Sequence, residues 1–190
     1  MSEFERWEGR YAAAGYVFGK EPNYFLASRR SMIPKLGKVL AVTGGEARNG
    51  VWLAQQGLEV LSLDSSPAAQ EKGKKLATER GANLKFELAD VPTWPYPETA
   101  FDVVVEIFTQ FSTRAERALN WAGMRKALKP GGLLILQGYT PKQLQFGTGG
   151  PKELENPYPG RCSSRASGRC NSPRRSSSCT RGIGTATYPR

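Results

Sequence analysis

The sequence predicts an α/β fold: a doubly wound, Rossmann-like, mostly parallel sheet with helices on both faces. Two observations predict it. Short apolar runs alternate with amphipathic segments from residue 38 to residue 139, and glycine or acidic residues follow the first three runs. Alternating strands and helices imply βαβ units with right-handed crossovers, which give a parallel sheet. The chain has 190 residues, enough for one domain with a sizeable core.

Five apolar runs of strand length predict the strands. Each is short and rich in Val, Leu, Ile or Phe, as expected for strands buried on both faces. The predicted strands are 38–42, 58–64, 83–90, 101–108 and 133–139. A KPGG turn at 129–132 precedes the last one.

The segments between the strands predict helices. They span 21–36, 49–56, 65–81 and 112–129. The third is the best delimited, because Ser65 or Ser66 can cap its start, Pro67 suits its first turn, and Gly81 suits its end.

The chain divides by composition into a domain, residues 1–158, and a Ser/Arg/Cys-rich tail, residues 159–190. The formal net charge is +10, but seven of the 27 basic residues lie in the tail, which has no acid. Residues 1–158 keep 20 basic and 17 acidic residues, so the net charge of the domain is small, as on an ordinary protein surface. The tail is predicted to be disordered. Nucleic acid is therefore expected as a partner only through the basic tail, if at all.

Cysteine and histidine usage predicts no metal site. The three cysteines all lie in the tail, at Cys162, Cys170 and Cys179, and the chain has no histidine. Neither the spacing nor the ligand set suits zinc. The N-terminus has no apolar run long enough for a signal peptide or a membrane span, so we expect a cytoplasmic protein without a membrane partner. The oligomeric state is left open.

Three polar features follow successive predicted strands. Gly44 and Gly45 follow the first, Asp64 ends the second, and Asp90 ends the third. Ligands of doubly wound sheets bind at the carboxyl ends of the strands. There a glycine loop allows close backbone approach, and an acid can accept hydrogen bonds from a ribose diol. With Asp90 at an exocyclic amine and Val91 beside the ring, the set predicts an adenosine pocket.

Each of these features also has a plainer explanation. A glycine pair is commonly just a tight turn, and Asp64 or Asp90 alone could cap a helix or a turn. The coincidence of all three at successive strand ends favours a binding site.

The loop favours S-adenosylmethionine over NAD. The dinucleotide motif needs G-x-G-x-x-G spacing, whereas the sequence from Gly45 is G-E-A-R-N-G. Glu46 would repel a pyrophosphate but would suit the positive charges of S-adenosylmethionine. A P-loop is excluded because no G-K-[ST] follows.

Four stretches of the chain occur in the order of the motifs of class I S-adenosylmethionine-dependent methyltransferases, which the chain resembles. They are VLAVTGGEARNGVWLA, LSLDSSPAAQEKGKKLA, LADVPTWPYPETAFDVVVEIF and LKPGGLLILQGY. YVFGKEPNYFL and GTGGPKELENPY resemble the tellurite-resistance type of small methyltransferase, which includes thiol and metalloid methylators. The resemblance covers about residues 4–158 and implies methyl transfer from S-adenosylmethionine, without a metal, to a small soft acceptor such as a thiol or oxyanion.

The resemblance also implies residue roles. The glycine loop would hold the methionine part of the cofactor, Asp64 the ribose, Asp90 and Val91 the adenine, and the end of the fourth strand would border the methyl group. The predicted cofactor-binding residues are Thr43, Gly44, Gly45, Glu46, Asp64, Ser65, Asp90, Val91, Glu106 and Ile107.

The N-terminal segment is expected to form a lid over the substrate, with Arg48 meeting an anionic acceptor. The candidate substrate residues are Tyr11, Tyr16, Asn23 and Arg48. The alternatives are packing of the aromatic rings against the sheet and a solvated helix position for Arg48. No catalytic residue is assigned.

The chain departs from the family pattern at three loop positions and in its tail. Ala41 stands where an acid is usual, and Thr43 and Ala47 stand where glycine is usual. Thr43 would be strained at positive φ, and the Ala47 methyl would crowd the cofactor, so weakened binding is expected. Members of that family usually continue with a helix and two more strands that complete the edge of the sheet. This sequence lacks them, so we expect the edge of strand 133–139 to be uncovered. A shifted reading frame near residues 157–161 would explain the tail. Alternatively, the chain is a non-catalytic cofactor-binding relic or a nucleic-acid-binding module that uses the tail.

Overall fold

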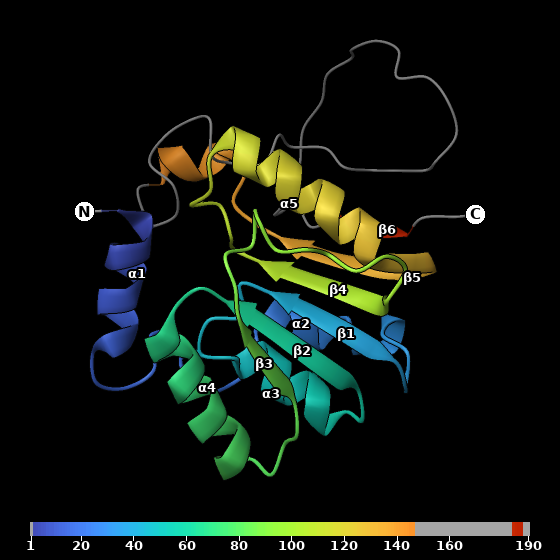
Figure 1. Ribbon diagram of the computed structural model, residues 1–190, viewed down its shortest axis with the longest axis horizontal. Coiled ribbons are helices and arrows are strands. Elements are labelled where there is room, and N and C mark those ends of the chain that lie inside the picture. The colour runs from blue at the N-terminus through green and yellow to red at the C-terminus, as the bar shows by residue number, and fades with distance from the viewer. Residues whose placement is uncertain (1, 147–183, 188–190) are drawn as a thin grey trace.

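The computed structural model describes residues 2–146 and 184–187, and its centre is a six-stranded sheet with the order β3-β2-β1-β4-β5-β6 (Figure 1). The strands are β1 Lys38–Val42, β2 Glu59–Asp64, β3 Lys85–Leu88, β4 Phe101–Ile107, β5 Leu128–Gln137 and β6 Gly184–Thr187. The first five pair in parallel, and β6 runs antiparallel to β5. The predicted fold class is confirmed.

Five α-helices and two short 3-10 helices accompany the described strands. They are α1 Glu3–Ala12, α2 Tyr24–Ser28, α3 Arg48–Gln55, α4 Pro67–Glu79, α5 Arg114–Ala127, η1 Arg30–Met32 and η2 Pro141–Gln145. Met124 of α5 packs on one face of the sheet with Leu40 and Val104. Leu53 of α3 packs on the other face with Val39. Helices therefore cover both faces, as predicted.

The described elements differ from the predicted ones at several places. The strand β3 covers only Lys85–Leu88 of the predicted 83–90, so the prediction that Asp90 ends this strand is wrong. The short helix η2 was not predicted. The segment 21–36 is not one helix, because α2 ends at Ser28 and the chain is extended at Ile33, before Pro34, where proline disfavours helical backbone. The KPGG sequence belongs to β5, which starts at Leu128 and shifts register between Phe101 and Val103 of β4. The helix α1 was not predicted.

The edge of the sheet differs from the expectation of an uncovered strand. Gly184–Thr187 pairs with β5 from Leu133 to Leu136, so these positions have a hydrogen-bonded neighbour. The expectation of an open edge is wrong for this part of β5. The rest of the tail, including 159–183, and the proposed frame shift at 157–161 lie outside the described residues.

The strand order places a topological switch point at β1. This strand lies between β2 and β4, so the chain leaves its carboxyl end toward one side and the later strands are added on the other. Ligands of such sheets bind beyond this point. Figure 1 shows α1 standing at the end of the sheet toward which the β4 and β5 arrows point. The N-terminal helix therefore borders the expected binding edge.

Candidate functional site

The loop after β1 is a tight turn that holds two glycine amides against the end of β2. Gly44 N donates to Leu63 O at 2.7 Å, and Gly45 N donates to Asp64 Oδ2 at 2.8 Å. A Cβ at position 44 would lie 2.2 Å from Ser62 Oγ, so the close approach requires glycine. The predicted glycine loop and the predicted acid are therefore in direct contact.

Asp64 is nearly buried, with 8% of its surface exposed. Its Oδ1 accepts from Ser66 N at 2.9 Å, and the Ser66 side chain caps α4, whereas Ser65 is exposed. Burial raises the pKa of Asp64 above its ordinary value, although the amides of Ser66 and Gly45 act in the opposite direction. The amides of Gly45, Ser65 and Ser66 bond to the carboxylate, whose two oxygens offer about four lone-pair sites, so Asp64 can still accept from a ligand hydroxyl.

Two residues of the loop carry side chains at left-handed backbone positions. Thr43 has φ 48° and Ala47 has φ 59°, a region that costs such residues about 1–2 kcal/mol. Thr43 was expected to be strained if its φ is positive, and its φ is indeed positive. The Ala47 methyl is fully buried in a cluster with Val51 and Leu76. It lies between α3 and α4, so the prediction that it crowds the cofactor is wrong.

Glu46 bonds to the N-terminal segment and to α4. Its Oε2 accepts from Val17 N at 2.7 Å, and its Oε1 lies 3.2 Å from Lys72 Nζ. The side chain is only 3% exposed. Both oxygens therefore have protein partners, which the interpretation of Glu46 as a counter-charge for the ligand did not foresee.

Asp90 and Val91 follow β3 in a turn that touches the end of β2. Ala89 N donates to Asp64 O at 3.0 Å. Asp90 is exposed, and its Oδ2 accepts from Thr93 Oγ1 at 3.0 Å, which is the turn-capping alternative. Val91 is 4% exposed and belongs to the apolar cluster on the α5 face. Their role at an adenine stays a prediction.

Glu106 and Ile107 end β4 on opposite faces of the sheet. Glu106 is 1% exposed, and its carboxylate accepts from the Thr109 hydroxyl. Alternation along the strand places it on the α5 face with Val104, whereas Ile107 packs against the cluster on the other face. Glu106 thus helps to hold the loop after β4. The placement of both residues beside a methyl group stays a prediction.

Tyr11 of α1 covers the glycine loop. A Cβ on Gly45 would lie 2.8 Å from the Tyr11 hydroxyl, and the tyrosine is 8% exposed. Burial raises its pKa well above its ordinary value, and the negative charges of Asp64 and Glu46 add to this effect. The phenol therefore stays protonated near neutral pH.

Tyr16 and Asn23 have structural partners. Tyr16 donates from its hydroxyl to Lys72 O at 3.1 Å. The side chain of Asn23 caps α2 by accepting from Leu26 N at 3.2 Å, and the backbone N of Asn23 donates to Asn49 Oδ1 at 2.8 Å. These contacts fix the N-terminal segment beside the loop. Contact with a substrate stays a prediction.

Arg48 bonds to the backbone of the same segment. Its Nη1 donates to Phe18 O at 2.7 Å and to Glu21 O at 3.3 Å. Burial lowers the pKa of its guanidinium, with Glu46 acting in the opposite direction. Arg48 thus supports the segment, and its contact with an anionic substrate stays a prediction.

Trp7 and Glu8 of α1 lie at the site and were missed by the sequence analysis, which named only Tyr11 of this helix. The Glu8 carboxylate accepts from the Ser66 hydroxyl and, at 3.3 Å, from Ala68 N at the start of α4. The signal was present, because Ser2 and Glu5 form a capping box that marks a helix start. This helix also brings an aromatic cluster to the site, in which the Trp7 ring lies near Tyr11, Phe18 and Phe111 with centroid distances of 5.6, 6.1 and 5.9 Å.

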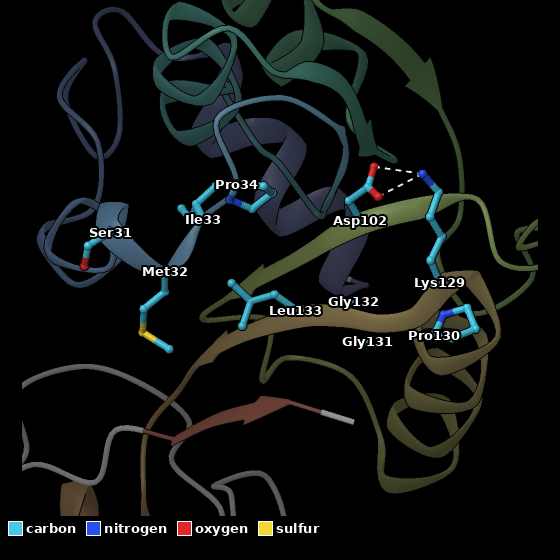
Figure 2. A pocket seen from close by; sticks show the side chains of 10 residues that line it. All are labelled: Ser31, Met32, Ile33, Pro34, Asp102, Lys129, Pro130, Gly131, Gly132 and Leu133. Carbon is cyan, nitrogen blue, oxygen red and sulfur yellow. Dashed lines mark hydrogen bonds and ion pairs between the residues drawn. The ribbon is translucent and has the colours of Figure 1, made fainter. Parts of the chain in front are cut away.

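A hollow lies at the end of the sheet opposite to the glycine loop. It is a groove of about 640 Å³ lined in part by Met32, Pro34 and Leu133. Figure 2 shows the ion pair of Lys129 with Asp102 at its rim, where Nζ and Oδ1 are 2.8 Å apart. Because this groove borders the amino ends of β1 and β4, it is separate from the glycine loop and Asp64.

Within residues 2–146 and 184–187, no helix is long and apolar enough to cross a membrane. The same residues contain no group of three His, Cys, Asp or Glu side chains arranged to hold a metal ion.

Comparison with known proteins identifies the domain. Residues 39–132, from β1 into β5, match the family described as Methyltransferase domain. Over these residues, just under half of the chain, the protein is similar to S-adenosylmethionine-dependent methyltransferases. The ubiquinone/menaquinone biosynthesis C-methyltransferase UbiE of Azotobacter vinelandii is 36% identical over 93 residues of this domain, which is 47% of this chain and 36% of that protein. The chain spans about a third of the length of the curated relatives it matches, with 36%, 31% and 38% covered.

Solved structures share the fold of this methyltransferase domain. Phosphoethanolamine N-methyltransferase 1 of Haemonchus contortus, solved with phosphoethanolamine and S-adenosylhomocysteine, has a TM-score of 0.62 at 18% identity, covering 72% of this chain and 32% of that one. A TehB-like SAM-dependent methyltransferase of Corynebacterium glutamicum has a TM-score of 0.53 at 25% identity, covering 69% and 67%. The first shows likeness of fold alone.

Proposed function

We propose that the chain binds S-adenosylmethionine and transfers its methyl group to a small acceptor. The observation that carries the proposal is the contact of Gly45 N with Asp64 Oδ2 at the carboxyl edge of β1 and β2, within a methyltransferase domain. This edge adjoins the switch point of the sheet, where the fold class binds its ligands.

The site residues fit the chemical groups of this cofactor. Asp64 can still accept from a ribose hydroxyl, and the close approach of Gly44 to β2 leaves a loop whose backbone can contact the methionine part. The turn at Asp90 lies beside Asp64, since Ala89 N donates to Asp64 O, and there we expect the adenine. When bound, the cofactor supplies a methyl group already activated by its sulfonium. The protein then needs mainly to align the acceptor and exclude water.

The acceptor we propose is a small thiolate or oxyanion. The resemblance of residues 16–26 to the tellurite-resistance type supports this class. Arg10 adds a cation at the aromatic cluster, with its guanidinium carbon 4.5 Å from the centroid of the Trp7 ring. An acceptor that is already ionised needs little base assistance. This suits a site in which Tyr11 is held protonated.

Calorimetric titration of the chain with S-adenosylmethionine and S-adenosylhomocysteine tests cofactor binding. We expect dissociation constants below about 1 mM, weakened by the strained loop. The Lys129→Met variant, altered in the groove at the far end of the sheet, is the control and should bind like the wild type. Absence of binding at millimolar cofactor would refute the proposal.

Methyl transfer is tested with cofactor labelled in its methyl group and a panel of small thiols, oxyanions and nitrogen nucleophiles. We expect label in the thiol or oxyanion products. Label only in nitrogen products would leave the methyltransferase proposal intact and remove the acceptor class. Binding without transfer to any acceptor would favour the non-catalytic alternative.

A further inference from the structure

Residues 13–21, here called the strap, join α1 to the cap of α2 and pass beside the glycine loop. Inside the strap, Gly19 N donates to Tyr16 O at 3.3 Å, and no described helix or strand includes these residues. Charged side chains of the domain supply other hydrogen bonds to the strap backbone. The order of the strap therefore depends on those side chains.

Lys72 of α4 provides the most complete of these contacts. Its Nζ donates to Ala13 O at 2.6 Å and Gly15 O at 2.5 Å, and it lies 3.2 Å from Glu46 Oε1. An ammonium group has three donors, so the three contacts match its whole capacity. The side chain is 18% exposed, which makes the contacts less screened than surface pairs.

Glu46 extends this contact to the glycine loop. Its second oxygen accepts from Val17 N at 2.7 Å, and the residue directly follows Gly45. Lys72 and Glu46 thus bind three backbone groups of the strap between them. The same pair connects the strap to the amide that bonds Asp64.

The helix that carries Lys72 is packed tightly against the loop. A Cβ on Gly73 would lie 2.9 Å from the Ala47 Cβ and 2.8 Å from Phe86 Cε1, so the close contact requires glycine. The Tyr16 hydroxyl also bonds to Lys72 O, so both the backbone and the side chain of Lys72 contact the strap. The ammonium is therefore held on a fixed support.

Other ion pairs of the strap are more exposed. In the pair of Lys20 with Glu79, the side chains are 39% and 51% exposed, and in the pair of Arg80 with Glu21 they are 32% and 77% exposed. Exposed pairs contribute little to stability.

We propose that Lys72 is a positioning residue for methyl transfer: it holds the strap and, through Glu46, the glycine loop in the geometry that binds the cofactor. This role rests on the proposed function. Lys72 acts through Glu46 and the strap, not on the reacting atoms. Its removal should weaken cofactor binding and leave the chemical step nearly unchanged.

The first test needs no cofactor. Hydrogen exchange by mass spectrometry compares peptides that cover residues 13–21 in the wild type and in Lys72→Met. We expect exchange of the strap to become about tenfold faster in the variant, while peptides of β1 and β4 keep their rates. Lys74→Met, on an exposed position of the same helix, is the matched control and should leave the strap unchanged. Unchanged strap exchange in Lys72→Met would overturn the proposal.

The second test separates binding from chemistry. We expect Lys72→Met to raise KM for S-adenosylmethionine about tenfold with kcat within about twofold of the wild type. Lys72→Arg keeps the charge and the donors, so it should recover much of the affinity. A fall in kcat with unchanged KM would overturn the proposal, as would equal impairment of Lys72→Met and Lys72→Arg.

The tests also cover a variant that does not fold and a wild type that binds no cofactor. If Lys72→Met does not fold, because Glu46 keeps a buried charge, the double variant Lys72→Met with Glu46→Gln removes both charges and takes its place in the exchange test. If the wild type binds no S-adenosylmethionine, the proposed function fails, whereas strap exchange still decides whether Lys72 holds the strap.

Discussion

Gly45 N lies 2.8 Å from Asp64 Oδ2, and this hydrogen bond joins the loop after β1 to the end of β2. The two residues are 19 positions apart in the chain, and the parallel pairing of β1 with β2 brings them together. A single carboxylate thereby shapes the glycine loop and faces the proposed ribose position. Substitutions of Asp64 should consequently lower the affinity for the cofactor more than the stability of the fold.

Replacing Asp64 with Asn should lower the affinity for S-adenosylmethionine by about 10- to 100-fold, because hydrogen bonds to a charged group contribute about 1.5–3 kcal/mol. Titration calorimetry measures the change. Glu71→Gln is the matched control, since Glu71 is an exposed acid of α4 whose partner is Lys75. Equal affinities of Asp64→Asn and the wild type would show that Asp64 does not contact the cofactor.

The same variant tests the pKa of Asp64. Burial raises its folded-state pKa above the ordinary 3.8, so the folded protein binds this proton more tightly than the unfolded chain. The resulting stabilisation is complete below the unfolded value and is lost as pH rises through the folded value. The free energy of unfolding of the wild type, relative to Asp64→Asn, should therefore fall as the pH rises above 3.8. Urea unfolding across this range measures it, and a difference that rises with pH would contradict the shift.

Thr43→Gly should stabilise the protein by about 1 kcal/mol, because it removes a β-branched residue from φ 48°. Ala47→Gly is the comparison. It relieves similar strain at φ 59° but loses a buried methyl group, worth about 0.8 kcal/mol, so its effect should be near zero. Urea unfolding measures both. A destabilised Thr43→Gly would mean that the 2.7 Å bond from its hydroxyl to Val42 O outweighs the strain.

The sheet and the glycine loop could be predicted because local chemistry specifies them. Apolar runs located β1, β2 and β4 to within a residue or so, and Ser66, Pro67 and Gly81 delimited α4. Asp64 was found because strand ends of a parallel sheet share one edge. Such features depend on neighbours in the chain or on the fold class, and both are visible in the sequence.

The partners of charged residues at the site could not be predicted in this way. Glu46 was correctly placed at the loop, but its contacts with Val17 N and Lys72 depend on how the strap passes over it. Lys72 bonds mainly to backbone carbonyls. Every residue has such a carbonyl, so the residue types in the sequence do not reveal these partners. The same applies to Glu8, whose partner Ser66 is 58 positions away. Tertiary contacts of this kind appear only once the N-terminal segment has been placed.

Gly45→Ala should disrupt the site and lower stability. The new methyl carbon would lie 2.8 Å from the Tyr11 hydroxyl, and the backbone has φ 54°. We expect a loss of at least about 1 kcal/mol from the backbone term alone, with weaker cofactor binding. Adding Tyr11→Phe removes the hydroxyl and leaves the ring carbon Cζ at 3.4 Å, an ordinary contact. Partial recovery of stability in the double variant, measured by thermal unfolding, would confirm the contact, and no recovery would refute it.

Gln110 joins the loop after β4 to the loop after β5. It is 3% exposed, its Nε2 donates to Tyr139 O at 2.7 Å, and its Oε1 accepts from Tyr139 N at 2.5 Å. The ring of Tyr139 lies 4.6 Å from that of Phe108, so the two hydrogen bonds also hold an aromatic pair. The side-chain amide thus pairs with both backbone groups of Tyr139.

Gln110→Ala should therefore cost about 2 kcal/mol of unfolding free energy through two lost hydrogen bonds. Since these loops lie beyond β4 and β5, away from Asp64, KM for the acceptor should rise more than KM for S-adenosylmethionine. Gln55→Ala is the control, because Gln55 makes an exposed 3.2 Å bond to Arg80 O and should change neither constant. Steady-state kinetics with each substrate varied in turn distinguishes the outcomes, and a rise confined to the cofactor constant would place the acceptor elsewhere.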